Sequence, residues 1–303
     1  MTSAPEISGV CPPRFHAVKD AFAANFTDAP DGLNEQGARF SVVIAGETVL
    51  DLWAGVADPR AKTPFTDNSL VPVFSSGKAV MALLMASAVQ RGRLAYEEKV
   101  AHLWPAYGAN GKAEVTVAQL LSHQDGLPEA EHDRVAALRK PSKAPDLGPI
   151  DAIKTAAFLD KGSAPGGRGS AEWRSIEIPS ANLHGTALAL ARIMGVFANE
   201  GALDCQTILS PAVLAEATKP RISGPDKVLP YDITWAAGLM RNAGLNVFGP
   251  NPDALGHCGW GGSCVMADPE IRLSAAYAMT RQSPYLIGDP RAQRLIEALY
   301  TAF

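Results

Sequence analysis

The chain has 303 residues and a net charge of −4, and its composition, 47% hydrophobic and 19% charged, is that of an ordinary globular protein. This length suggests two lobes, and the lack of a basic excess gives no footprint for nucleic acid. No apolar run reaches the ~18 residues of a membrane span, and the N-terminus lacks the basic start and apolar core of a signal peptide. We therefore expect a soluble, cytoplasmic protein.

The first ninety residues predict a helix, a hairpin and a second helix. Apolar residues recur at helical spacing over residues 14–26, and β-rich runs flank a turn at Gly46 within residues 40–54. Residues 78–90 are rich in Ala, Leu and Met and free of Gly and Pro, which predicts a helix.

The middle of the chain is less regular. A short helix is expected over residues 115–122, with Thr116 as its N-cap, and a longer amphipathic helix over residues 184–200. Between them, residues 139–170 are dominated by Pro, Gly, Lys and Ser and predict loops around one helix at residues 150–160.

The C-terminal part predicts a strand at residues 233–240, a hairpin at residues 263–279 and a closing helix near residues 289–302. The order of these elements favours an α+β fold: a helix and a hairpin come first, then helices and loops, then strands and a final helix. We expect one sheet built from both ends of the chain.

The four cysteines are scattered, at Cys11, Cys205, Cys258 and Cys264. They form neither a C-x-x-C pair nor a zinc-type spacing, so we expect no structural metal and no disulfide framework. No cofactor is expected.

Ser75 and Lys78 form an S-x-x-K motif where an apolar, strand-like run, residues 70–74, meets the predicted helix. Two helical residues three apart lie on one face, and a helix N-terminus offers N–H donors to an oxyanion. Serine needs a base, and Lys78 would serve near pH 7 only if its pKa fell by about 3.4 units. On the motif alone, an N-cap serine and a solvated lysine are the better interpretation.

A glycine-rich run, from Gly256 to Ser263, comes just before the C-terminal hairpin. Such a run lets a substrate carbonyl approach the backbone closely. His257 within it can donate a hydrogen bond to a substrate carboxylate or assist proton transfer. The alternative is a β-turn with a satisfied histidine.

Five runs, in this order, resemble the signature runs of the β-lactamase-related family, above all its family VIII carboxylesterases and 6-aminohexanoate-oligomer hydrolases. They are FSSGKAV, LLSHQDGLP (120–128), EIPSANLHGTALALAR (177–192), GPNP (249–252) and GHCGWGGSCVMADPE (256–270). The resemblance extends from about residue 9 to the C-terminus. It implies a β-lactamase/transpeptidase-like fold, in which helices flank an antiparallel sheet, and a serine hydrolase.

The resemblance also implies roles for the motif residues. Ser75 matches the acylated nucleophile, and Lys78 matches the lysine that helps to deprotonate it. The family's tyrosine, which shares that role, is missing: residues 129–176 contain no tyrosine and are shorter than the family's insertion. Three alternatives follow. Lys78 acts as sole base, or another group such as His123, Asp125 or a tyrosine from a second subunit takes the place of the missing tyrosine. In the third, the protein is a catalytically feeble remnant that binds ligands or partners. For His123 and Asp125 we favour a structural role.

The remaining matches concern the cleft. The segment His257, Cys258 and Gly259 matches the Lys-Thr-Gly (or His-x-Gly) motif on a strand that lines it. The backbone N–H groups of Ser75 and Trp260 match the two oxyanion-hole donors, and Trp173 matches a segment that borders the acyl pocket. The Trp260 indole either narrows that pocket or fills space left by missing residues.

The resemblance predicts a sheet domain from residues 1–74 and 184–303, and a reduced helical lobe at residues 75–183. We expect a carboxylesterase that acts on small esters through an acyl-enzyme on Ser75. The alternative is a catalytically weak or inactive protein that binds ligands or partners; hydrolysis of β-lactams or amides ranks lowest. The expected partners are a small ester or amide substrate and, because the cleft lacks part of a wall, a second copy of the chain, but no nucleic acid or membrane.

Overall fold

The computed structural model describes residues 4–109, 111–124, 167 and 169–303, and these are organised around an antiparallel sheet. Its strand order is β1-β3-β2-β14-β13-β12-β11-β10-β9, and β4 extends it by pairing with β3. The strands from the N-terminal part are β1 (Ser8–Val10), β2 (Gly37–Ile44), β3 (Glu47–Asp58) and β4 (Thr63–Pro64). Those from the C-terminal part are β9 (Ile222–Pro225), β10 (Asp232–Trp235), β11 (Met240–Arg241), β12 (Leu255–Cys258), β13 (Cys264–Asp268) and β14 (Leu273–Met279).

The two ends of the chain meet in the middle of this sheet, where β2 pairs with β14. Both predicted hairpins are confirmed, as β2–β3 and as β13–β14. The predicted single strand at 233–240 is wrong. The chain turns back on itself there, because Gly238 adopts a φ of +85° and the Ala236 N–H bonds to the Leu239 carbonyl, so β10 and β11 are separate, paired strands.

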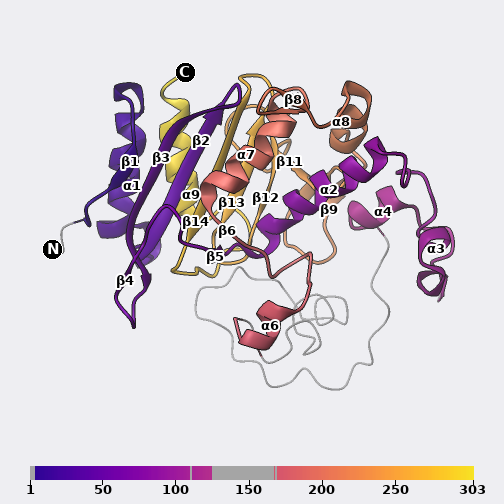
Figure 1. Cartoon of the computed structure of the whole chain (residues 1–303), viewed down its shortest axis with the longest axis horizontal. Helices are drawn as coiled ribbons and strands as arrows, with labels where there is room; N and C mark the ends of the chain where they lie inside the picture. Colours follow the sequence, from indigo (N-terminus) through magenta and orange to yellow (C-terminus); the bar gives the residue numbers. More distant parts are fainter. Residues whose placement is uncertain (1–3, 110, 125–166, 168) are drawn as a thin grey trace.

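Helices cover both faces of the sheet, so the fold has three layers (Figure 1). One face carries α1 (His16–Thr27) and α9 (Pro290–Tyr300), and the other carries α2 (Lys78–Gln90) and α7 (Ala187–Ala198). Alternate residues of each strand serve the two layers: in β13, Val265 and Ala267 pack on the α2/α7 side and Met266 on the α1/α9 side. The predicted α+β class is confirmed.

Shorter elements connect these layers. The helices are α3 (Val100–Leu103), α4 (Val117–Leu121), α6 (Ala171–Ser175) and α8 (Pro211–Thr218), and the single turns are η1 (Pro13–Phe15), η2 (Pro30–Gly32), η3 (Phe74–Gly77) and η4 (Pro105–Gly108). Two small ribbons pair β5 (Val71–Pro72) with β6 (His184–Gly185) and β7 (Ala202–Leu203) with β8 (Gln206–Thr207). In the described part of the chain, no helix is both long and apolar enough to cross a membrane.

Helix predictions succeed where capping or composition gives a clear signal. The α2 helix has the predicted bounds, and Thr116 caps α4 in a reciprocal capping box with Gln119. The α7 helix starts at residue 187 rather than 184, since residues 184–185 pair with β5 and Thr186 provides the N-cap. The helix predicted at residues 150–160 lies outside the described residues.

Candidate active site

Ser75 lies in the η3 turn, between the short strand β5 and the helix α2 (Figure 1). The residue before it, Phe74, has a φ of +46°, an unfavourable conformation for a bulky side chain. The Ser75 side chain caps no helix, because α2 begins only at Lys78 and no side chain bonds its first N–H groups. The interpretation of Ser75 as an N-cap is therefore wrong, and the turn instead presents its hydroxyl to Lys78.

The S-x-x-K pair is assembled. Lys78 Nζ lies 3.0 Å from Ser75 Oγ and donates a second hydrogen bond, 2.8 Å long, to the Ser180 carbonyl oxygen. Within the described residues no carboxylate forms an ion pair with this amine. Burial without a counter-charge lowers the pKa of Lys78 to about 8. About one molecule in ten then carries a neutral lysine at pH 7, ready to accept a proton.

Ser180 is a neighbour of Ser75 that motif reasoning missed. Its carbonyl oxygen contacts Lys78 Nζ and lies 3.5 Å from Ser75 Oγ. Asn182 secures this segment: its side chain accepts from the Ile178 N–H at 3.0 Å and donates to the Trp173 carbonyl at 2.7 Å. Every residue has a carbonyl, so no residue type in the sequence signals this contact.

Trp173 lies beside the η3 turn, but it is only 1% exposed. Its ring centre is 6.1 Å from that of Phe74 and 5.9 Å from that of His184. The indole thus packs against Phe74 and His184, directly behind the residue that precedes Ser75. In this position it supports the turn, and it offers little surface to a substrate.

The opposite side of Ser75 is formed by the end of β12. Gly259 lies so close that a Cβ there would be 2.2 Å from both the Val73 carbonyl oxygen and Ser263 Oγ. Ser263 donates a 2.7 Å hydrogen bond to that carbonyl, and Ser76 Oγ lies 3.0 Å from Ser263 Oγ and 3.3 Å from the His257 carbonyl oxygen. Buried hydroxyls therefore connect this strand end to the η3 turn that contains Ser75.

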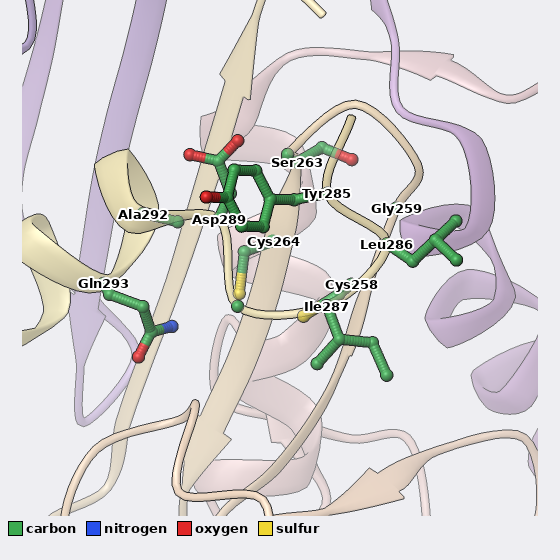
Figure 2. Close-up of a pocket in the computed structure, with 12 residues that line it drawn as sticks. Cys258, Gly259, Ser263, Cys264, Tyr285, Leu286, Ile287, Asp289, Ala292 and Gln293 are labelled. Carbon is green, nitrogen blue, oxygen red and sulfur yellow. The ribbon is translucent and has the colours of Figure 1, made fainter. Parts of the chain in front are cut away.

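His257 and Cys258 point to opposite faces of β12, as neighbours in a strand do. His257, cross-strand from Val265, is on the α2 side and only 2% exposed; its Nδ1 lies 2.8 Å from the Cys258 carbonyl oxygen. Cys258 packs in the other layer beside Cys264, in a small pocket behind the turn (Figure 2). The structure thus does not bring the Cys258 side chain to Ser75.

The His257 imidazole is neutral. Burial holds its pKa well below the usual range, and the positive charge of Lys78 lowers it further. Its Nε2 is buried and makes no hydrogen bond within the described residues. A neutral ring offers no charge to a substrate carboxylate, but it remains able to donate or accept one hydrogen bond.

His123 and Trp260 complete the predicted set. The His123 ring stacks on Trp235 with 4.2 Å between ring centres, and the Trp235 ring is 5.7 Å from that of His257. Trp260 is partly buried and follows Gly259 in the turn that joins β12 to β13. Asp125 lies outside the described residues. Among those described, no group of three or more His, Cys, Asp and Glu side chains could hold a metal ion.

A serine–lysine pair at the start of a helix, facing the end of an antiparallel strand, characterises proteins with the β-lactamase/transpeptidase-like fold. The family model described as Beta-lactamase matches residues 22–145 and 126–299. The chain belongs to this family, and the resemblance of its motifs is confirmed. Membership of this family supports a hydrolase.

Solved structures extend the likeness over nearly the whole chain. A penicillin-binding protein homologue from Caulobacter crescentus is 40% identical with a TM-score of 0.87, covering 98% of this chain and 100% of that one. A family VIII carboxylesterase is 31% identical with a TM-score of 0.83 and the same coverage.

A sequence relative, Esterase/beta-lactamase LipL of Mycobacterium tuberculosis (strain ATCC 25618 / H37Rv), is 27% identical over 373 residues, which cover 93% of this chain and 85% of that protein. The aligned length exceeds the 303 residues of this chain, so the relative contains residues that this chain lacks.

Proposed function

We propose that the protein is a serine carboxylesterase that hydrolyses small, uncharged esters through an acyl-enzyme on Ser75. One observation carries the proposal: a partly buried lysine, which pairs with no carboxylate among the described residues, lies 3.0 Å from the hydroxyl of Ser75. That distance suits direct proton transfer, and the lowered pKa of Lys78 makes the neutral amine accessible near neutral pH. The likeness to a family VIII carboxylesterase and to Esterase/beta-lactamase LipL supports ester hydrolysis in particular.

In the acylation step, Ser75 Oγ attacks the ester carbonyl carbon while its proton passes to neutral Lys78 Nζ. The carbonyl oxygen becomes an oxyanion, which the N–H groups of Ser75 and Trp260 stabilise in this proposal. As the C–O bond to the alcohol breaks, the Lys78 ammonium returns the proton to the leaving oxygen. The products are the free alcohol and an acyl group on Ser75.

Deacylation repeats these transfers with water as the nucleophile. Lys78 accepts a proton from the water that attacks the acyl carbon, and then returns it to Ser75 Oγ as the acid departs. The Ser180 carbonyl accepts a hydrogen bond from Lys78 throughout and so restricts the direction of the amine. The carbonyl has no proton of its own to give, so Lys78 carries the proton transfer that the family divides with a tyrosine.

The preference for uncharged esters follows from His257. This residue stands where the family's Lys-Thr-Gly motif carries a cation, but burial keeps its imidazole neutral. A carboxylate-bearing substrate, such as a β-lactam, gains no charge pairing from it. We therefore expect p-nitrophenyl acetate to be hydrolysed and nitrocefin to be a poor substrate.

The test compares the wild-type enzyme with Ser75→Ala on p-nitrophenyl acetate. We expect hydrolysis by the wild type and only background by the variant. A fluorophosphonate probe should add one mass equivalent to the wild type and none to Ser75→Ala in intact-mass spectrometry. Equal rates for the two proteins, or an unlabelled wild type, would overturn the proposal.

A second candidate is a catalytically weak protein of the same fold that binds ligands. It is favoured by the Ser180 carbonyl, because an acceptor 2.8 Å from Nζ stabilises the ammonium that cannot act as a base. Absence of both labelling of Ser75 and turnover of any small ester would support this candidate over the esterase.

A further inference from the structure

The turn that follows β12 is held from behind as well as from the nucleophile side. The Gly261 N–H donates to the Tyr285 carbonyl at 3.1 Å. The Gly261 carbonyl accepts from the Ser283 N–H at 2.9 Å and from Arg291 Nη2 at 3.2 Å. Of these contacts, only that of Arg291 comes from a side chain. Arg291 lies at the start of α9, thirty positions from the turn along the chain.

The Arg291 guanidinium is fully buried and each of its nitrogens has a partner. Nε and Nη2 donate to the two carboxylate oxygens of Asp289 at 3.0 and 2.8 Å. Nη1 lies 2.6 Å from Glu35 Oε1 and donates to the Arg281 carbonyl at 2.9 Å. A bidentate pair of this kind fixes the plane of the guanidinium. The direction of the hydrogen bond to Gly261 is thereby fixed too.

The turn rests directly on this charged pair. Gly262 has a φ of +110°, and a Cβ there would lie 2.2 Å from Asp289 Oδ2 and 2.8 Å from Arg291 Nη2. The backbone therefore approaches the pair as closely as a glycine allows. Asp289 lines the pocket behind the turn, together with Cys258 and Cys264 (Figure 2).

Burying a guanidinium and two carboxylates costs free energy, whereas burying apolar residues of the same size would not. Stability alone therefore does not explain the cluster of Arg291, Asp289 and Glu35. We propose that Arg291 is a positioning residue for acyl transfer: through Gly261 it holds the 259–262 turn at the distance from Ser75 at which the Trp260 N–H meets the oxyanion. The inference rests on the proposed function, since it assigns that N–H to the oxyanion hole.

The chain contains a matched control. Arg39 is also buried, at 3% exposed, and forms a bidentate pair with Asp51, at 2.7 and 2.6 Å, in the same sheet. This pair joins β2 to β3 and does not touch the turn. Arg291→Lys and Arg39→Lys both retain the positive charge and lose the bidentate geometry. They differ chiefly in what is loosened, which is the 259–262 turn in the first and the β2–β3 pair in the second.

We expect Arg291→Lys to lower kcat for p-nitrophenyl acetate by about 10- to 100-fold with KM little changed, less than the ~10²–10³-fold loss when an oxyanion donor is deleted. Asp289→Asn keeps an N-cap for α9 and provides a second variant if Arg291→Lys does not fold; its kcat should fall less. Arg39→Lys should leave kcat within about threefold of the wild type, because the Arg39–Asp51 pair does not contact the 259–262 turn and its loss acts on stability alone.

Hydrogen exchange of the segment 256–268, followed by mass spectrometry, gives a readout that does not depend on turnover. Exchange should be faster there in Arg291→Lys and unchanged in Arg39→Lys. An inactive wild type would refute the esterase, but the exchange result would still show whether Arg291 holds the turn. Unchanged exchange, or an equal fall in kcat for Arg291→Lys and Arg39→Lys, would overturn the positioning role.

Discussion

The two sides of the nucleophile are built differently. On one side, the strand end from His257 to Ser263 is buried and tied to the nucleophile turn through three hydroxyl-mediated hydrogen bonds. On the other, the segment around Ser180 is exposed and presents a single backbone carbonyl to Lys78. We call the first the β12 wall (residues 257–263) and the second the Ser180 segment (residues 176–183).

This difference separates two tasks of the site. The β12 wall has no room to move, as suits groups that must meet a developing charge at a fixed distance. The Ser180 segment meets the amine of Lys78, and a carbonyl there can orient that amine without taking part in proton transfer. Close packing is thus greatest on the side that the proposed mechanism assigns to the oxyanion, and the proposed base, Lys78, owes its lowered pKa to burial.

The largest expected effect comes from the base. Lys78→Met should reduce kcat/KM by about 10²–10⁴-fold, because among the described residues no other basic side chain is hydrogen-bonded to Ser75 Oγ. In the wild type, kcat/KM should rise with pH to a plateau with a midpoint at about 8, since the ammonium below that pH cannot accept a proton. Steady-state hydrolysis of p-nitrophenyl acetate across the neutral to alkaline range measures both.

Lys78→Arg is the matched control for charge, because a guanidinium stays protonated throughout this range. It should be as inactive as Lys78→Met at every pH. If Lys78→Arg retained activity, or if the midpoint lay near that of an ordinary histidine, the base would be a group other than Lys78.

The β12 wall could be predicted from the sequence better than the Ser180 segment, for a physical reason. The S-x-x-K spacing and the glycine-rich run are local, and each combines residue types that the chemistry needs. The Ser180 contact uses a backbone atom, which carries no residue signature. Arg291 and Glu35 form their pair across more than 250 positions, and nothing in either neighbourhood reveals the partner.

The fold shows the same division. The hairpins and the α2 helix follow from periodicity and turn residues within their own segments. The single strand expected at 233–240 failed because Gly238 packs against Ala82 of α2, in a tight turn that only the assembled layers require. Predictions therefore held where the deciding interactions lie close in sequence.

The comparison of the β12 wall with the Ser180 segment can be tested by adding one methyl group at a glycine next to each. Neither Gly259 nor Gly77 has a positive φ, so alanine fits both backbones and only the space differs. In Gly259→Ala the methyl would lie 2.2 Å from the Val73 carbonyl, and in Gly77→Ala 2.8 Å from Leu183 Cβ in the Ser180 segment. We expect kcat to fall ~10²-fold in Gly259→Ala, as for a 1 Å misplacement, and less than about tenfold in Gly77→Ala, because Leu183 is only partly buried and can shift more easily.

Gly185→Ala is the control, because its nearest contact, Leu190 Cγ at 3.8 Å, is an ordinary one. It should retain wild-type kcat and unfold at the wild-type denaturant concentration. Equal losses of kcat in Gly259→Ala and Gly77→Ala would show that the β12 wall and the Ser180 segment are equally rigid.

The smallest expected effect concerns the charges behind the β12 wall. Glu35, hydrogen-bonded by Tyr277 and paired with Arg291, has its pKa raised to about 7 by burial, which outweighs the guanidinium. The unfolded chain releases this proton near pH 4.5 and the folded one near 7, so stability falls as pH rises through that window and is level above it. Denaturant unfolding should show a free energy of unfolding that falls by up to about 1.4 kcal/mol per pH unit, and Glu35→Gln should remove this slope.

The same variant should keep the kcat/KM midpoint at about 8, because Lys78 faces the Ser180 segment. A slope that survives in Glu35→Gln would mean that another group titrates behind the turn. A shifted kcat/KM midpoint would mean that the titration of Lys78 is coupled to that of Glu35.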